Sequence, residues 1–453
     1  MNGVSSASRS AYAGFTPLRT GLLAVVALTV MGCSDKEVIL PGERLDIRAP
    51  FEDSAATTEP QVNRKQSFSA PRAVNNANWT HRNGGTSHYL GNPSLRSTLA
   101  PLWSASIGEG DSRKNRLSTD PVAANGRIFT LDSRARVSAH ATNGGQLWSV
   151  DLTPTGDRSG ETSGGGLAVA NDVLIAVTGF GEMIALNVKT GAELWTQRVD
   201  ANFNSNPTIY GDLVYAVSRD NIAWAVNIKN GRVQWQIPGT PSPTSIVGSA
   251  GPAISGDRVL FPFSSGEILS AFRRGGVRLW ASSVSGRRPG AAYAGITDIT
   301  GDPVVVGSTV YAANASGRTV ALDLRSGDLK WTAPEGSTGP LWVAGGSVFL
   351  VSDQAKLVRL NANTGDIIWK VDLPYFEAEK IKKRKTIYAH HGPVLAGGRL
   401  WLASTDGYLR SFDPTDGREV ARIELPDGAT TNPIVVNNTL YIVTTAGNLL
   451  AYR

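Results

Sequence analysis

Residues 206–235 read NPTIYGDLVYAVSRDNIAWAVNIKNGRVQW, and this stretch decides the fold. Two apolar runs, 213–217 and 222–227, are separated by polar turn residues, and Asn230-Gly231 follows the second run. Short runs of this kind, joined by tight turns rich in Gly, Asn and Asp, predict antiparallel strands. With a first strand opened by Pro207 and a fourth that begins at Val233, the stretch predicts one four-stranded antiparallel sheet.

The same pattern recurs along the chain, almost position for position, at 302–331, 392–421 and 432–453. Its most regular mark is a Gly followed four residues later by a Trp. This pair occurs at 144/148, 191/195, 231/235, 276/280, 327/331 and 365/369, and a seventh copy has Gly417 followed by Ala421. Four strands in roughly 45 residues are typical of one blade of a β-propeller.

Eight such units can be counted, with openings near residues 121, 166, 207, 252, 303, 340, 393 and 433. The last unit stops at Arg453, where its fourth strand should begin, whereas the strand around Trp103 has no unit of its own. We therefore predict an all-β, eight-bladed propeller whose ring is closed by the N-terminal strand near Trp103. Eight blades are preferred over seven because only eight use both this strand and the incomplete last unit.

The Gly and Trp of the repeat have a physical role in this fold. Glycine supplies the positive φ angle of a tight turn without steric cost. We expect the Trp four residues later to lie flat against the turn of the neighbouring blade and so to tie the blades together. A cofactor role for these tryptophans is not expected.

The first 33 residues predict a lipoprotein signal. Arg9 and Arg19 precede an apolar run of ten residues, 21–30, which is too short for a membrane span of about 20 residues. The following Val30-Met31-Gly32-Cys33 resembles a bacterial lipobox, which implies cleavage before Cys33 and lipidation of its thiol. The alternative is an ordinary signal peptide followed by a chance cysteine.

Three segments follow from these patterns: a signal peptide at 1–32, a lipidated flexible tether at 33–78, and a propeller at 79–453. The tether is predicted from its polar, proline-punctuated sequence without strand or helix periodicity. Removing Arg9 and Arg19 with the signal changes the formal net charge from +6 to +4. Apart from one cluster, the remaining Lys and Arg are scattered, so nucleic-acid binding is not expected.

The repeat resembles that of the quinoprotein-like propellers, A-x-[DN]-x-x-[TS]-G-x-x-x-W, as residues 185–195 and 321–331 illustrate. The segment 78–85 also looks like the opening of such proteins. Two classes share this repeat: quinone-dependent alcohol and sugar dehydrogenases, and the BamB family of lipoproteins in the outer-membrane β-barrel assembly machinery. The lipobox, the blade count and the lack of an appended domain resemble the second class.

Chemistry also argues against the dehydrogenase class. The single Cys excludes the vicinal disulfide that such enzymes place beside their quinone, and the sequence has no C-x-x-C-H haem motif and no calcium-loop spacing of carboxylates. His390 and His391 are adjacent on a predicted strand and so point to opposite faces, which makes them poor joint metal ligands. We therefore predict no catalytic residue, no metal and no cofactor.

The resemblance implies a non-catalytic scaffold, anchored by lipid in the outer membrane and facing the periplasm. It would bind the POTRA domains of the barrel-inserting subunit, BamA, and help to insert β-barrel proteins, with unfolded outer-membrane proteins as further partners. The alternatives are a periplasmic quinone-dependent dehydrogenase-like enzyme and a generic propeller adaptor of another envelope complex.

The resemblance also implies a partner site on two loops, 238–251 and 285–302. Ile246 and Asp298 match the side-chain types expected there, whereas Val247 replaces a basic residue and Thr300 replaces an acid. Arg287 and Arg288 are expected to supply charge instead. The alternative is that both segments are ordinary connections between blades.

One long insertion, 374–390, contains the basic cluster of the body: Lys380, Lys382, Lys383, Arg384 and Lys385. Such a cluster is expected either to meet acidic lipid headgroups or an acidic partner, or to be a solvated loop without a partner.

Overall fold

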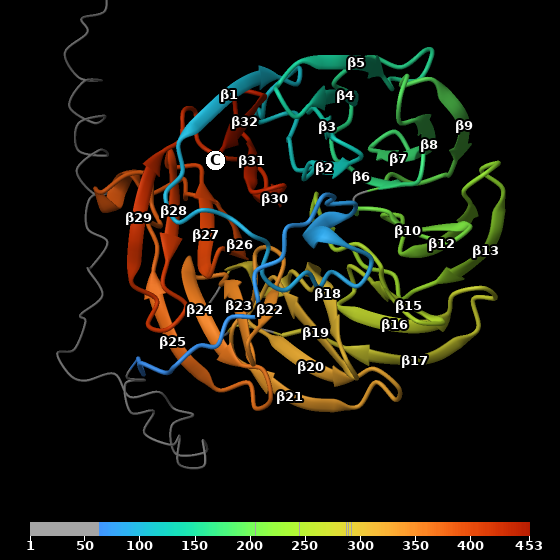
Figure 1. Ribbon diagram of the computed structural model, residues 1–453. Helices are drawn as coiled ribbons and strands as arrows, with labels where there is room; N and C mark the ends of the chain where they lie inside the picture. The colour runs from blue at the N-terminus through green and yellow to red at the C-terminus, as the bar shows by residue number, and fades with distance from the viewer. Residues whose placement is uncertain (1–62, 204, 244, 287, 289, 291) are drawn as a thin grey trace, which may run out of the picture. The chain divides into compact units, whose positions relative to one another are not determined.

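The computed structural model describes residues 63–453 except 204, 244, 287, 289 and 291. Residues Val62–Arg453 form one compact unit. Within the described residues it contains eight four-stranded antiparallel sheets arranged as a ring (Figure 1). The predicted all-β, eight-bladed propeller is therefore confirmed.

Seven blades are built from four consecutive strands, which run from the centre of the ring to its rim. Blades 1 to 4 comprise β2 (Val122–Ala124), β3 (Arg127–Leu131), β4 (Arg136–Ala141) and β5 (Gln146–Asp151); β6 (Gly165–Ala170), β7 (Val173–Thr178), β8 (Glu182–Asn187) and β9 (Glu193–Arg198); β10 (Thr208–Tyr210), β11 (Leu213–Val217), β12 (Ile222–Asn227) and β13 (Val233–Pro238); β14 (Ala253–Ser255), β15 (Arg258–Pro262), β16 (Glu267–Phe272) and β17 (Arg278–Ser283). Blades 5 to 7 comprise β18 (Ile299–Val306), β19 (Thr309–Asn314), β20 (Thr319–Asp323) and β21 (Leu329–Ala333); β22 (Trp342–Ala344), β23 (Ser347–Val351), β24 (Lys356–Asn361) and β25 (Ile367–Asp372); β26 (His390–Ala396), β27 (Arg399–Ser404), β28 (Tyr408–Phe412) and β29 (Glu419–Glu424).

The eighth blade closes the ring. It contains β30 (Ile434–Val436), β31 (Thr439–Val443) and β32 (Asn448–Tyr452), and its outer strand is β1 (Pro101–Ser106). β1 pairs antiparallel with β32, with Trp103 opposite Ala451, and Figure 1 shows β1 beside the last strands of the chain. The predicted closure by the N-terminal strand is confirmed.

Helical structure in the described residues is limited to three short 3₁₀ turns: η1 (Arg82–Gly84), η2 (Ala292–Gly295) and η3 (Ile381–Lys383). None of these has the length or composition of a membrane-spanning helix.

Two of the proline-marked blade openings differ from the prediction. Pro303 and Pro393 lie inside β18 and β26, which begin at Ile299 and His390. Both strands shift register at this point, between Gly301 and Val304 and between His391 and Val394. Because proline has no N–H to donate to a ladder, it is accommodated at such irregularities, and the strand continues upstream of it.

Neighbouring blades are joined by a tryptophan that lies over a glycine turn, as predicted. For example, a Cβ atom on Gly327, whose φ is +79°, would lie 2.5 Å from Cδ2 of Trp280. Nε1 of Trp280 donates to the carbonyl oxygen of Leu324 in the same turn, at 3.1 Å. The same contact joins Trp103 to Gly144, Trp148 to Gly191, Trp195 to Gly231, Trp235 to Gly276, Trp331 to Gly365 and Trp369 to Gly417.

The missing eighth tryptophan has a structural reason. Ala421 pairs with Ser411 in β28, the register position that a tryptophan occupies in each other blade. The next blade around the ring is the eighth, and its two outer strands, β32 and β1, come from opposite ends of the chain. They are not joined by a turn, so Ala421 has no glycine turn to cover.

The centre of the ring is occupied by residues 76–93, which we call the hub segment (Figure 1). It forms hydrogen bonds to the innermost strand, or to residues next to it, in all eight blades. The bonded pairs are Trp79 with Ala123, Thr80 with Val169, His81 with Ile209, Thr86 with Ile254, Ser87 with Val305, Asn83 with Leu341, Pro93 with Gly397 and Asn76 with Asn437. The hub segment therefore satisfies inner-strand groups that would otherwise face an open channel.

The predicted boundary between tether and propeller, at residue 78, lies further toward the N-terminus in the structure, because residues 63–78 contact the propeller. The N–H of Arg64 donates to the carbonyl oxygen of Ile368 at 3.0 Å, and Arg359 donates to the carbonyl oxygen of Gln66 at 2.8 Å. The ring of Phe68 packs edge-on against Phe349. The polar composition that predicted a free tether did not reveal these backbone contacts, and the compact unit begins at Val62.

The contact between blades can be tested with two glycines of blade 5. Gly327→Ala forces a Cβ against Trp280, whereas Gly307→Ala, with φ +58° and no atom within 4 Å of the new Cβ, carries only the backbone cost. We expect Gly307→Ala to lower the unfolding free energy by about 1–2 kcal/mol and Gly327→Ala by about 1–3 kcal/mol more. Chemical denaturation measures both, and equal losses would contradict the proposed role of the indole contact.

Candidate functional site

One face of the ring carries the connections between blades. In each antiparallel blade the turns after the first and third strands lie on one face, which we call the turn face. The turns after the second strand and the connections to the next blade lie on the other, which we call the connection face. Both predicted partner loops are such connections: one joins β13 to β14 and the other joins β17 to β18.

Buried carboxylates of the second loop fasten the first loop in place. Oδ1 of Asp298 accepts the N–H of Ile246 at 2.8 Å, and Oδ1 of Asp302 accepts the N–H of Gly251 at 2.6 Å. Both aspartates are fully buried. Burial raises the pKa of Asp298, and the N–H of Ile246 opposes this rise. Hydrogen bonds between described residues therefore join the two loops at two points.

The predicted partner residues divide into surface and interior groups. Val247 is 39% exposed and Ile246 is half-buried. Asp298 and Thr300 are buried, and the hydroxyl of Thr300 donates to the carbonyl oxygen of Ser337. In this structure Asp298 and Thr300 thus support the loops from below, and Val247 lies on the surface.

The charge of Arg288 is used within the protein. Its guanidinium makes two hydrogen bonds to Asp353, from Nε at 2.6 Å and from Nη2 at 2.8 Å, and it lies 3.4 Å from Glu335. The hydroxyl of Tyr293 donates to the same Asp353 at 2.9 Å. Arg288 therefore braces the second loop against blade 6, while Arg287 lies outside the described residues.

A buried arginine connects the two loops to the hub segment. Nε of Arg82 donates to Asp120 at 3.1 Å, its Nη1 lies 3.6 Å from Asp302, and Nη1 also donates to the carbonyl oxygen of Gly248 at 3.1 Å. Burial raises the pKa of Asp120, and the charge of Arg82 opposes this rise. Arg82 thus holds the residue next to Val247 from the centre of the ring.

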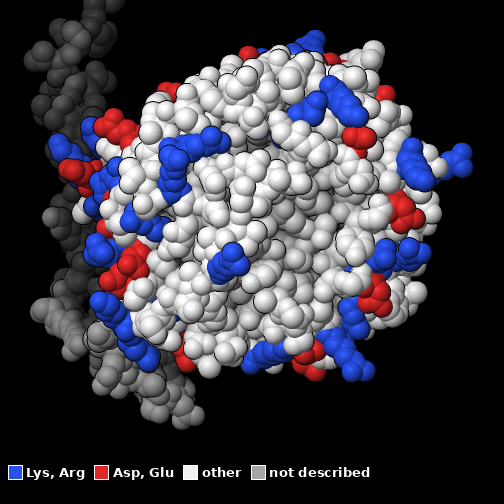
Figure 2. All heavy atoms as spheres, in the orientation of Figure 1, with Lys and Arg blue, Asp and Glu red and all other residues white. Residues whose placement is uncertain are grey.

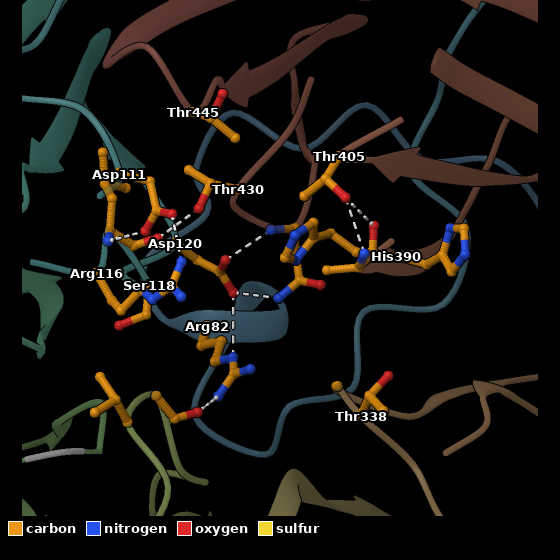
Figure 3. Close-up of a pocket in the computed structure, with 17 residues that line it drawn as sticks. Arg82, Asp111, Arg116, Ser118, Asp120, Thr338, His390, Thr405, Thr430 and Thr445 are labelled. Atoms are coloured by element: carbon orange, nitrogen blue, oxygen red, sulfur yellow. Dashed lines mark hydrogen bonds and ion pairs between the residues drawn. The ribbon is translucent and has the colours of Figure 1, made fainter. Parts of the chain in front are cut away.

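A cavity of about 280 Å³ opens beside Arg82 and Val247. Figure 3 shows Asp120 and the hydroxyl side chains of Thr338, Thr405 and Thr430 around it. Arg116, also in the lining, pairs with Asp111 at 2.9 Å. Since each of the two lining arginines is paired with a carboxylate, the cavity offers hydroxyl and amide groups for hydrogen bonding rather than an unpaired charge.

The adjacent histidines of β26 also line this cavity. His390 is held by the hydroxyl of Ser404 at 2.6 Å and the carbonyl oxygen of Pro374 at 2.7 Å. Burial, with His390 and Arg82 as further causes, lowers the pKa of His391 to about 3. No group of three His, Cys, Asp or Glu residues suited to a metal ion occurs in the part of the chain that the structure describes. His390 thus joins β27 to the residue at which the insertion between β25 and β26 begins.

The remaining predicted residues are placed as follows. The basic cluster lies between β25 and β26, and all five of its cations are exposed. Cys33 lies outside the described residues. On the face drawn in Figure 2, Lys and Arg are interspersed with Asp and Glu around the rim, so no large patch of one sign gathers there.

Sequence reasoning missed the buried group formed by Arg82, Asp120 and Asp302. A signal was available, because polar residues precede the opening prolines at Asp120-Pro121, Asn206-Pro207, Asp302-Pro303 and Asn432-Pro433. All four polar residues are buried, and Nδ2 of Asn432 donates to Asp120 at 2.6 Å. At four of the seven opening prolines the preceding residue thus supplies a polar side chain to the interior, whereas Gly251, Gly339 and Gly392 precede the other three.

The comparisons with known proteins agree with the fold. A family model described as outer membrane protein assembly factor BamB matches residues 133–371 and 358–453. A protein of that name from Yersinia pestis is 25% identical over 370 residues, which are 80% of this chain and 91% of the relative. The corresponding protein from Escherichia coli K12 is 25% identical over 357 residues, 77% of this chain and 88% of the relative.

Two solved structures share the architecture. The crystal structure of BamB from Moraxella catarrhalis aligns with a TM-score of 0.66 and 22% identity, over 79% of this chain and all of that chain. A europium-containing methanol dehydrogenase aligns with a TM-score of 0.63 and 13% identity, over 83% of this chain and 98% of that chain. At these identities both likenesses concern the fold alone.

The ring of eight blades and its tryptophan repeat define a quinoprotein-like β-propeller, a class that includes enzymes as well as assembly factors. Because the family model covers most of the propeller, the choice within this class can be made. The chain belongs to the family of the outer membrane protein assembly factor BamB.

The buried arginine gives a pH-dependent prediction. When folding raises the pKa of a carboxyl group, its protonated form stabilises the fold at acid pH, and this stabilisation is lost as the pH rises through the folded pKa. The pKa of Asp120 is raised in this way, and removing the charge of Arg82 raises it further. We expect Arg82→Met to lower the unfolding free energy by about 3–5 kcal/mol at neutral pH. This deficit should shrink toward about pH 4, as Asp120 takes up a proton.

Arg116→Met is the matched control, because Arg116 is more than half exposed in its pair with Asp111. It should cost no more than about 1 kcal/mol and change little with pH. Denaturation curves at both pH values measure the two variants. A deficit of Arg82→Met that is the same at both values would indicate lost packing rather than an uncompensated carboxylate.

Proposed function

We propose that this chain is a non-catalytic scaffold of the machinery that assembles β-barrel proteins in the outer membrane. The observation that carries this proposal is its membership in the BamB family, whose relatives bear the name of an outer membrane protein assembly factor. A rigid ring that presents fixed loops on one face suits a scaffold. The chain would work at the outer membrane and face the periplasm.

The proposed partner is the barrel-inserting subunit, BamA, bound through its POTRA domains. Val247 and the half-buried Ile246 would form the contact, and unfolded outer-membrane proteins would reach the same face. Asp298 and Thr300 would position the loops, and Arg288 would brace them. The fixed loop supports this assignment, because a preorganised contact loses less conformational entropy on binding.

The contact can be tested by placing a charge on it. Val247→Asp should weaken binding of purified POTRA domains by roughly tenfold or more, because a carboxylate would be buried at an apolar contact. The exposed position of Val247 makes loss of folding an unlikely consequence of this change. Binding isotherms measure the affinity directly.

Val277→Asp is the matched control, because Val277 is 60% exposed and precedes β17 on the turn face. It introduces the same charge and should leave the affinity unchanged. Equal affinity of both variants for the POTRA domains would count against the Val247 surface.

We further propose that Cys33 carries the lipid anchor. Cys33→Ser removes the thiol that would be acylated, so an uncleaved precursor without lipid is expected. Metabolic labelling with palmitate and the mobility of the chain on gels report the two steps. Ser34→Ala, beside it, should be processed normally, and normal processing of Cys33→Ser would refute the anchor.

A further inference from the structure

The insertion between β25 and β26 is a formed hairpin. The N–H of Tyr388 donates to the carbonyl oxygen of Tyr375 at 2.9 Å, and that of Glu377 donates to Thr386 at 3.2 Å. Phe376 and Ile387 form the bridge between these bonds. The 3₁₀ turn η3 lies at the tip. We call residues 374–389 the basic hairpin.

The tip of the basic hairpin carries cations that the propeller does not use. The ammonium groups of Lys380, Lys382, Lys383 and Lys385 have no hydrogen-bond or ion-pair partner among the described residues. Arg384 lies over the ring of Phe376, 4.8 Å from its centre. With five cations and two acids, Glu377 and Glu379, the hairpin has a formal charge of +3.

Apolar side chains are exposed among these cations. Ile381, at the tip, is 80% exposed, Ile387 is 53% exposed and Phe376 is 37% exposed. A large apolar side chain held in water between lysines is unfavourable unless a partner covers it. A membrane interface accommodates both kinds of group at once, since anionic headgroups attract the cations and the acyl boundary takes the apolar residue.

The start of the described chain lies beside the same blade. Arg64 bonds to Ile368, and Asn63 bonds to Lys370 through both its side-chain oxygen and its side-chain nitrogen, at 2.9 Å each. From Arg64 back to Asn63 the chain thus follows β25 from Ile368 to Lys370, toward the end from which the hairpin begins. The proposed anchor, Cys33, is 30 residues before Asn63 in the sequence.

We propose that the basic hairpin binds the surface of membranes that contain anionic phospholipids, with its cations on the headgroups and Ile381 in the interface. This inference concerns a surface other than the proposed BamA contact. The position of the described N-terminus uses the proposed anchor as an argument, but the charge and exposure of the hairpin do not depend on it.

The test uses residues 34–453, which keep the whole compact unit and lack the lipid and the signal peptide. Sedimentation should show binding to phosphatidylcholine vesicles that contain about one third phosphatidylglycerol, and weaker binding as salt is added. Lys382→Gln with Lys383→Gln should weaken binding by roughly 25-fold, at about fivefold for each charge.

The control is Lys229→Gln with Arg232→Gln, which removes the same charge from an exposed turn of blade 3 and should leave binding nearly unchanged. Ile381→Gln should weaken binding by about tenfold at constant charge. Thermal unfolding of each variant verifies that the propeller is intact.

Three outcomes would overturn the proposal. The first is equal binding to vesicles with and without phosphatidylglycerol, which leaves an acidic protein as the occupant of the hairpin. The second is that the control pair weakens binding as much as the hairpin pair. The third is that Ile381→Gln has no effect, which removes the apolar contact. Val247→Asp should still bind vesicles, and the hairpin variants should still bind POTRA domains, so the two proposals can fail separately.

Discussion

The contact on which this ring depends joins the indole of one blade to the glycine turn of the next, and it is made at seven of the eight junctions between blades. It needs a residue without a Cβ, because the aromatic ring lies within 3 Å of where that atom would be. It also needs a turn carbonyl that accepts the indole N–H, as in six of the seven contacts. In the seventh, Nε1 of Trp235 has no acceptor among the described residues, and the carbonyl oxygen of Arg273 in that turn accepts the hydroxyl of Tyr215.

The contact between tryptophan and glycine turn holds the blades together at the rim of the ring, and the hub segment holds them at its centre. On the connection face, Arg82 reaches from the hub segment to the carbonyl oxygen of Gly248, and Asp298 accepts the N–H of Ile246, so these two backbone groups of the first loop are held in place. Backbone groups that are held by hydrogen bonds in this way differ from those of a loop that becomes ordered only when a partner binds. Asp298 and Asp302, which accept the N–H groups of Ile246 and Gly251, are buried, so they position the loop without being part of its surface.

The sequence predicted those features of the fold that depend on the type of residue at a given position. Gly and Trp at fixed spacing locate six of the eight blades. Ala421 was visible as an exception in the seventh, although only the seam between β32 and β1 explains it. The hub segment was not predictable, because most of its bonds to the blades use backbone atoms and leave no trace in residue type. Residues 63–78 were not predictable as part of the propeller either, because their polar sequence does not show that Phe68 packs against Phe349 or that Asn63 bonds to Lys370. Arg82 and Asp302 were missed because 220 positions separate them in the chain, and their pairing exists only once the ring is closed.

The hub segment has a consequence for the order in which the molecule can be completed. It precedes every blade strand in the sequence, so it emerges first from the ribosome and from a translocation channel. Its partners arrive later, and the last of them, around Asn437, arrives near the end of the chain. β1 likewise waits for β32. The hub segment and β1 thus wait longest for their last partners, and a chain interrupted before Asn437 would lack the final hub contact as well as the last blade.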